Sequence, residues 1–121
     1  MATIKSFTSL EQSKKLAEIL PLESADMYYT SGDEYDICFG SGVYKEIADW
    51  ICKGTPRPAD IPCWSLAALL DILPKINGLK PILDLEENSI QYTGIDLYVV
   101  ADNPVDACVA MIIKLHERKM L

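Results

Sequence analysis

The sequence is poor in the residues that most often perform chemistry in proteins. Its 121 residues include one histidine, four cysteines and six glycines. No two cysteines form a C-x-x-C pair, so the close ligand pairs typical of a structural zinc site are missing. No glycine-rich loop completes the dinucleotide or P-loop pattern. We therefore expect no metal site, no cofactor and no catalytic residue.

Long apolar runs and an excess of positive charge are also missing. The longest apolar run is far shorter than the roughly 20 residues of a membrane span, and residues 1–5 lack the apolar core of a secretory signal. The net charge is −7, from 18 acidic and 11 basic residues. Phosphate backbones and anionic lipids repel such a chain. We expect a cytoplasmic protein that binds no membrane and makes no direct phosphate contact with nucleic acid.

What the sequence does contain is apolar surface for a core. Half of the residues are hydrophobic, and a chain of this length buries roughly two-thirds of its unfolded surface without disulfides. The most apolar segment runs from Pro62 to Pro74, where Ser65 is a suitable helix N-cap and leucines recur on one face. We expect this helix, over residues 65–73, at the centre of the fold. Cys63 and Cys108 are expected to be small buried hydrophobes.

Two further helices have capping signals. Ser9 and Gln12 have the spacing of a capping box and predict a helix over residues 9–20. Asn103 as N-cap and Pro104 at the first helical position predict a last helix over residues 104–120. Apolar residues at helical spacing predict another helix over residues 43–53. The proline-bearing residues 55–62 are interpreted as a surface loop.

Alternating and β-branched segments predict strands in two places. Residues 27–30 and 35–39 flank a turn cluster and predict a hairpin. Residues 82–86, 89–93 and 95–101 predict three more strands. Together these elements predict one compact α+β domain over residues 1–121, with an antiparallel sheet packed against three to four helices.

Three blocks of the sequence carry a resemblance. They span residues 24–28, 61–70 and 103–108, and the last of them opens the final helix. In these blocks the chain resembles a group of small uncharacterised proteins from gut Bacteroidales genomes, often encoded by phages or mobile elements. The group has no assigned function and no catalytic residues to transfer. The resemblance implies only a context, that of an accessory protein of a phage or mobile element.

His116 is the one candidate for acid–base chemistry. It could act as a general base or a metal ligand. The alternative is a histidine that faces the helix dipole at the C-terminal end of the last helix and covers the edge of the core. The residues favour this alternative, because no serine or cysteine nucleophile motif accompanies His116. A small hydrolase or nucleotide-modifying enzyme that uses carboxylates and His116 remains the alternative function.

Acidic clusters and one glycine pair complete the polar candidates. Both clusters fall at predicted hairpin turns and are interpreted as solvated tips, since neither has the EF-hand spacing for Ca²⁺. The pair Gly40 and Gly42 is interpreted as a flexible junction rather than a phosphate-binding loop. An acidic mimic of nucleic acid is a further alternative, and it requires carboxylates along one face. The clusters comprise Asp33, Glu34 and Asp36, and Asp84, Glu86 and Glu87.

Aromatic residues give the leading functional hypothesis. Tyrosine and tryptophan are enriched at protein interfaces, where they bury a large area at low entropic cost. We therefore predict a non-enzymatic protein that binds another protein or associates with itself. The alternative for the same residues is ordinary packing in the core and on a half-buried sheet. The interaction candidates are Tyr28, Tyr29, Tyr35, Trp50 and Trp64.

Overall fold

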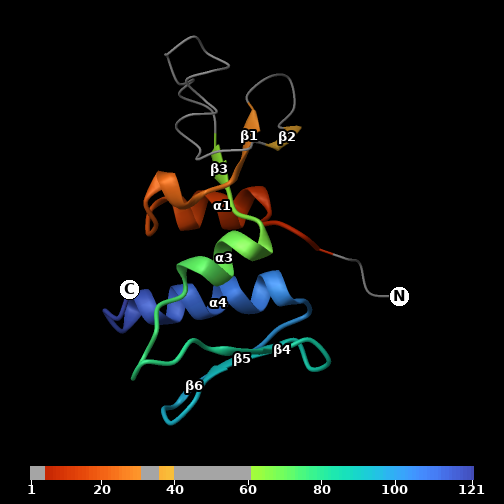
Figure 1. Ribbon diagram of the computed structural model, residues 1–121. Coiled ribbons are helices and arrows are strands. Elements are labelled where there is room, and N and C mark those ends of the chain that lie inside the picture. Colours follow the sequence, from red (N-terminus) through yellow and green to blue (C-terminus); the bar gives the residue numbers. More distant parts are fainter. Residues whose placement is uncertain (1–4, 31–35, 40–60) are drawn as a thin grey trace.

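The computed structural model describes residues 5–30, 36–39 and 61–121 (Figure 1). The described ranges contain three α-helices, one 3-10 turn and six strands, which confirms the predicted α+β class. The predicted helix over residues 43–53 and the pair Gly40 and Gly42 lie outside the described ranges. In chain order the elements are α1 Leu10–Ala17, η1 Leu22–Ser24, β1 Met27–Thr30, β2 Asp36–Phe39, β3 Ile61–Cys63, α3 Leu66–Ile72, β4 Ile82–Asp84, β5 Ser89–Tyr92, β6 Leu97–Val100 and α4 Pro104–Glu117.

The strands form two separate antiparallel sheets. One has the order β2-β1-β3 and the other the order β4-β5-β6. The sheets lie at opposite ends of the molecule, with the three helices between them (Figure 1). Helix α4 contacts β5, β6, α3 and α1, while α1 contacts β3. The expected antiparallel strands are therefore present, and the helices divide them into two groups.

The β2-β1-β3 sheet contains the first predicted hairpin and one strand that was not predicted. Met27 pairs with Phe39 across the hairpin, as expected for two strands joined by a turn. Residues 55–62 were interpreted as a surface loop, and this is wrong for its last two residues, which belong to β3. Pro62 pairs with Tyr28. A proline is accepted there because β3 is an edge strand, and only one side of an edge strand needs donors.

The N-terminal helix is fixed by the predicted capping box. The Gln12 main-chain N–H donates to Ser9 Oγ over 3.2 Å, and the Ser9 N–H donates to Gln12 Oε1 over 3.0 Å. The segment before this helix runs beside the start of α3, where Thr8 N donates to the Trp64 carbonyl over 3.0 Å. The buried hydroxyls of Thr8 and Ser13 lie 2.7 Å apart and bond each other. The polar groups of this junction therefore satisfy one another, as buried polar groups must.

The short helix α3 begins at Ser65, as predicted. Ser65 Oγ accepts from the Ala68 N–H, and Asp26 accepts from both the N–H and the hydroxyl of Ser65. At the other end, Lys80 Nζ donates to the carbonyls of Leu70, Asp71 and Leu73, the last over 2.6 Å. A cation at this end satisfies carbonyls that have no partner within the helix. Both termini of α3 are thus held by residues from other segments.

The last helix, α4, is the centre of the core, so the prediction that the helix over residues 65–73 occupies the centre is wrong: Leu69 is the buried residue of α3. Asn103 caps it and Pro104 occupies its first turn, as predicted. Trp64, Leu69 of α3 and Leu73 directly after α3 share its buried cluster with residues of β5 and β6. Cys63 and Cys108 are buried thiols, as expected. No helix in the described ranges is long and apolar enough to cross a membrane. The buried residues of α4 are Val105, Ala107, Cys108, Val109, Met111, Ile112 and Leu115.

Candidate functional site

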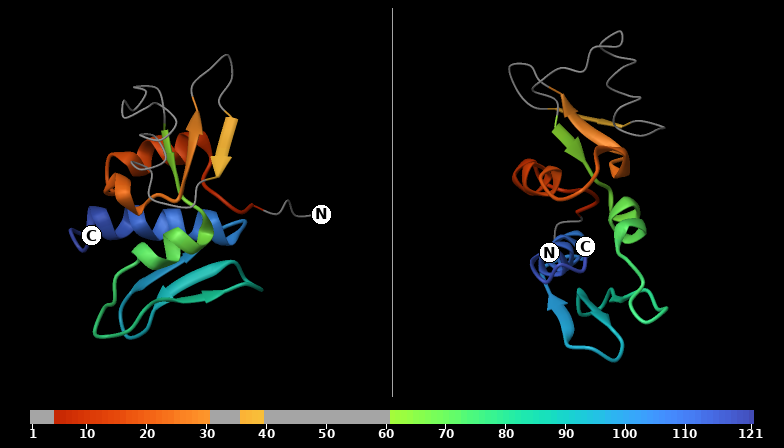
Figure 2. Two further views of the ribbon diagram at one scale, coloured as in Figure 1. Left: turned by 45° about the horizontal axis from the view of Figure 1, so that its top comes forward. Right: turned by 90° about the vertical axis from the view of Figure 1, so that its left-hand side faces the viewer.

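Within the described ranges, helices cover only one face of the β4-β5-β6 sheet. The register places Leu83, Ile90 and Val99 side by side, and Ile90 is fully buried on the face that packs against α4. Side chains of a strand alternate between faces, so the neighbouring row of Ile82, Gln91 and Tyr98 points the other way. In Figure 1 and Figure 2 no described element lies beyond that second face.

We call this second side of the sheet the outer face. Ile82 is 56% exposed, Val100 52% and Tyr98 42%. Single apolar residues are common on protein surfaces. Here the three share one face of one small sheet: Tyr98 and Val100 are neighbours on β6, and Gln91 of β5 separates them from Ile82. Exposed apolar side chains gathered on one face favour an interaction site. The outer face consists of Ile82, Asp84, Ser89, Gln91, Tyr98 and Val100, of which Ser89 is buried.

Tyr98 is held in place on the outer face by a carboxylate. Its hydroxyl donates to Glu87 Oε1 over 2.5 Å, and Glu87 Oε2 accepts from Ser89 Oγ over 3.2 Å. The hydrogen bond to Glu87 raises the pKa of Tyr98 above its ordinary value. The main chain of Tyr98 is held in β6 and its hydroxyl is held by Glu87. Its ring therefore presents an ordered apolar surface to solvent.

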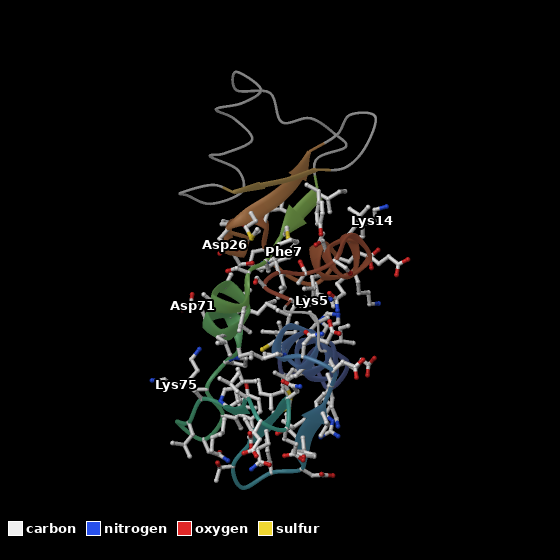
Figure 3. The ribbon with its side chains drawn as sticks, turned by 90° about the vertical axis from the view of Figure 1, so that its right-hand side faces the viewer. Lys5, Phe7, Lys14, Asp26, Asp71 and Lys75 are labelled. Atoms are coloured by element: carbon white, nitrogen blue, oxygen red, sulfur yellow. The ribbon has the colours of Figure 1, made fainter. Side chains whose placement is uncertain are left out.

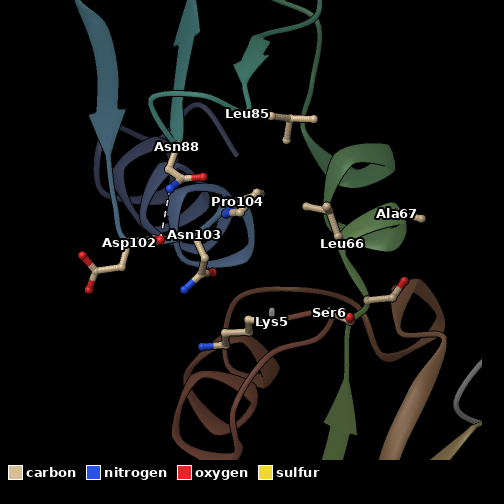
Figure 4. A pocket seen from close by; sticks show the side chains of 10 residues that line it. Lys5, Ser6, Leu66, Ala67, Leu85, Asn88, Asp102, Asn103 and Pro104 are labelled. Carbon is tan, nitrogen blue, oxygen red and sulfur yellow. Dashed lines mark hydrogen bonds between the residues drawn. The ribbon is translucent and has the colours of Figure 1, made fainter. Parts of the chain in front are cut away.

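A cavity lies beside this sheet, where α3 and α4 begin. It has a volume of about 480 Å³ and is lined by Lys5, Leu66, Leu85, Asn88 and Asp102, among others. Figure 4 shows these side chains around the opening, with the Asn88 amide donating to the Asp102 carbonyl over 3.1 Å. None of the residues lining this cavity is a histidine or a cysteine. The cavity therefore lacks a nucleophile–base pair of the Cys–His or Ser–His kind.

Several polar side chains at this cavity are held by partners within the fold. Lys5 lies between α1 and α4 (Figure 3) and forms an ion pair of 2.7 Å with Asp106. Asp106 also accepts from Gln12 Nε2 over 2.8 Å and from Asn103 Nδ2 over 2.9 Å. Burial alone would raise the pKa of Asp106, but these hydrogen bonds and the charge of Lys5 lower it below 3.8. The network links α1 to the start of α4 and so stabilises the packing of these two helices.

His116 lies at the opposite end of α4 from the cavity. Its ring is exposed, and Nδ1 lies 3.3 Å from the main-chain oxygen of Leu121. At a rise of 1.5 Å per residue, His116 is about 20 Å along the helix from the Asn103 cap. Its position in the last turn agrees with the dipole interpretation. In the described part of the chain, no group of three histidine, cysteine or acidic residues could hold a metal ion.

The aromatic candidates from the sequence do not form one surface. Trp64 is fully buried, and its Nε1 donates to Ser24 Oγ over 2.9 Å. A partner cannot reach this ring, so its assignment to an interface is corrected to the core. Tyr29 is half-buried and its hydroxyl donates to the Thr8 carbonyl over 2.9 Å. The side chain of Tyr28 is not described, and Tyr35 and Trp50 lie outside the described ranges.

The second acidic cluster has the predicted role of a hairpin tip. Asp84 Oδ1 accepts from the N–H groups of Glu86 and Glu87, over 2.9 and 3.2 Å, and closes the turn between β4 and β5. Such a side-chain cap of a turn is typical of aspartate. In the first cluster, Asp33 and Glu34 lie outside the described ranges and the side chain of Asp36 is not described.

Comparison with known proteins adds no family. No protein-family model, no curated protein and no solved structure matches this chain. The candidate site therefore rests on the geometry alone.

Proposed function

We propose that this protein is a non-enzymatic interaction protein that binds another protein through the outer face of the β4-β5-β6 sheet. The observation that carries the proposal is the exposure of Ile82, Tyr98 and Val100 together on that face. Covering these side chains removes apolar surface from water, which drives most protein association. The ordered ring of Tyr98 adds a residue type that is enriched at interfaces.

Other features are compatible with this role. The cavity where α3 and α4 begin has several polar side chains engaged in the fold and lies at the other end of α4 from His116. The resemblance to proteins of phages and mobile elements supports the context of an accessory protein. The net charge of −7 and the reduced thiols Cys63 and Cys108 suit a cytoplasmic location. Context and location are parts of the same proposal.

A matched pair of variants tests the proposal. Ile82→Thr combined with Val100→Thr keeps β-branched residues in the strands but makes the outer face polar. The control, Leu22→Thr, removes an exposed apolar side chain from η1, outside this sheet. We expect quantitative affinity capture from cells that make the protein naturally to retain a specific protein, and we expect the double variant to lose it. The control should retain it.

Two results would overturn the proposal. One is a captured protein that binds the double variant as well as it binds the wild type. The other is the absence of any specific protein, combined with a strict monomer in size-exclusion light scattering. Circular dichroism of both variants checks that their folds are unchanged.

A further inference from the structure

We propose that the partner adds an extended strand to the free edge of β6, and that this strand alternates apolar residues and carries a basic residue at each end. This inference rests on the proposed function and specifies how the partner binds. It follows from three features of the sheet: the hydrogen bonds that β6 leaves open, the difference between its two edges, and the charges around them.

The alternation of hydrogen bonds along β6 shows which of its main-chain N–H and C=O groups do not bond to β5. Ala101 N donates to the Asn88 carbonyl over 3.0 Å. In an antiparallel ladder, hydrogen-bonded pairs recur at every second residue, so Val99 also bonds to β5. The N–H of Leu97, two residues earlier, donates to the Ile95 carbonyl in the turn over 2.9 Å. The N–H and C=O groups of Tyr98 and Val100 therefore point away from β5. Within the described ranges, no hydrogen bond reaches these groups. They form a template for another strand.

The two edges of the sheet differ in how well they are protected. β4 is three residues long and follows Lys80 and Pro81, two residue types that block strand addition. β6 has four residues, all apolar or aromatic, and contains neither proline nor lysine. The right-hand view of Figure 2 shows β6 at the margin of the molecule. An incoming strand therefore has one favourable place to add.

Negative charge predominates around the β6 edge. From Pro81 to Asn103 the sequence contains no lysine or arginine. Arg118, the C-cap of α4, donates to the carbonyl of Asp96, the residue directly before β6, over 3.2 Å. Complementary charge steers and selects partners, so lysine or arginine suits the ends of the added strand. The carboxylates of the segment are Asp84, Glu86, Glu87, Asp96 and Asp102.

The same charges disfavour a second copy of this chain as the occupant. A symmetric antiparallel pair keeps all the outward hydrogen bonds within the two β6 strands only when Tyr98 lies opposite Val100 of the second copy. That register places Asp96 opposite Asp102 at both ends of the new pair. Like charges directly opposite each other destabilise a strand pair, and each copy also carries a net charge of −7. A basic segment of another protein avoids both the opposed carboxylates and the repulsion between two negatively charged chains.

A short capped peptide tests the inference on the wild-type protein. The probe has seven residues, with lysine at both ends, valine at the third and fifth positions and threonine elsewhere. When it runs antiparallel to β6, its valines lie opposite Tyr98 and Val100 and its lysines reach Asp96 and Asp102. We expect NMR titration to shift the amide signals of β6, and hydrogen exchange to slow at Tyr98 and Val100. High salt should weaken this binding.

Two modified peptides provide matched controls. N-methylation of both valines removes the donors that face β6, whereas N-methylation of the central threonine removes a donor that faces away. We expect the first peptide to bind at least about tenfold more weakly than the second. Replacing both lysines by glutamates should weaken binding by at least about the same factor.

Protein variants separate this inference from the proposed function. Val100→Pro removes one outward donor and no bond to β5, and Val100→Thr retains that donor. We expect the proline variant alone to lose the lysine peptide and the natural partner. A natural partner that depends on Ile82 and Val100 side chains but ignores Val100→Pro would overturn the edge model and leave the proposed function intact.

Three further results would also overturn it. They are equal binding of the two N-methylated peptides, no response to the lysine peptide at millimolar concentration, and protection of Tyr98 that grows with protein concentration alone. The last result would identify a second copy as the occupant.

Discussion

The two faces of the β4-β5-β6 sheet are built from similar side chains and differ in what covers them. Ile90 and Tyr92 on the inner face are buried against the core that α4 contributes. Ile82 and Tyr98 on the outer face are the same residue types, and both are exposed. The composition of a strand therefore does not reveal which of its faces belongs to the core. The position of the covering helix, α4, decides which face belongs to the core.

This comparison shows that the outer face is unusual for the exposed side of a sheet. A one-layer sheet usually has one apolar face and one polar face, because only one of them is buried. Here the outer face keeps apolar side chains where the fold gives them nothing to pack against. The pairing of identical residue types on opposite faces also supplies internal controls. Each substitution on the inner face has a counterpart on the outer face.

The largest expected effect is on the inner face. Ile90→Ala leaves a cavity in the core and should lower the free energy of unfolding by about 2–5 kcal/mol. Ile82→Ala removes the same atoms from an exposed position and should change it by no more than about 0.5 kcal/mol. Urea unfolding followed by circular dichroism measures both. Equal losses for the two variants would show that the outer face is also covered.

The strands of this sheet could be predicted from the sequence, but the orientation of their faces could not. Strand propensity and turn residues located β4, β5 and β6 to within a few residues. The four residues of β6 are all apolar or aromatic, so they lack the alternation that would mark the inner side. The outer face was missed for this reason, although the strands were expected.

Trp64 illustrates a local signal that was available. It precedes the N-cap Ser65, and Leu69 lies at the fourth helical position. An apolar pair at these two positions is the hydrophobic staple, and both residues are fully buried in one cluster. In contrast, Lys5 and Asp106 are separated by 101 residues. No local pattern predicts such a contact, because it depends on how the helices pack.

The second largest effect is expected at the start of the helix that covers the inner face. Asp106→Asn removes the charge that pairs with Lys5 and should cost about 1–2 kcal/mol at neutral pH. The folded pKa of Asp106 lies below its unfolded value of 3.8. The carboxylate therefore contributes its full stability above about pH 4, and this contribution is lost as the pH falls through the folded pKa.

Measurement of unfolding free energy from pH 2 to pH 7 checks this prediction. The gap between the wild type and Asp106→Asn should close at the acidic end of the range. Asp71→Asn is the control, since Asp71 is exposed on α3 and the substitution changes the net charge equally. A constant gap at all pH values would mean that the ion pair does not link α1 to α4.

A smaller effect is expected from the buried tyrosine of the inner face. Tyr92 donates its hydroxyl to the Pro74 carbonyl over 2.7 Å, and burial raises its pKa from 10.0 to about 12. Tyr92→Phe should cost about 1 kcal/mol, because the carbonyl loses its donor. In the wild type, the raised pKa contributes stability below pH 10 that disappears between pH 10 and about 12. The variant should lack this alkaline loss when unfolding is measured across that range.

The smallest effect is expected at Tyr98, the counterpart on the outer face. Tyr98→Phe removes the hydrogen bond to Glu87 but exposes no new cavity, so stability at neutral pH should change less than in Tyr92→Phe. The pKa of Tyr98 is also raised, so its hydrogen bond is present below pH 10 and is lost as the pH rises through the folded pKa. Absorbance titration of the tyrosinates should show one fewer raised transition in the variant than in the wild type. If Tyr98→Phe destabilised the fold as much as Tyr92→Phe, the outer face would hold the sheet together, and a partner would have no free surface to bind there.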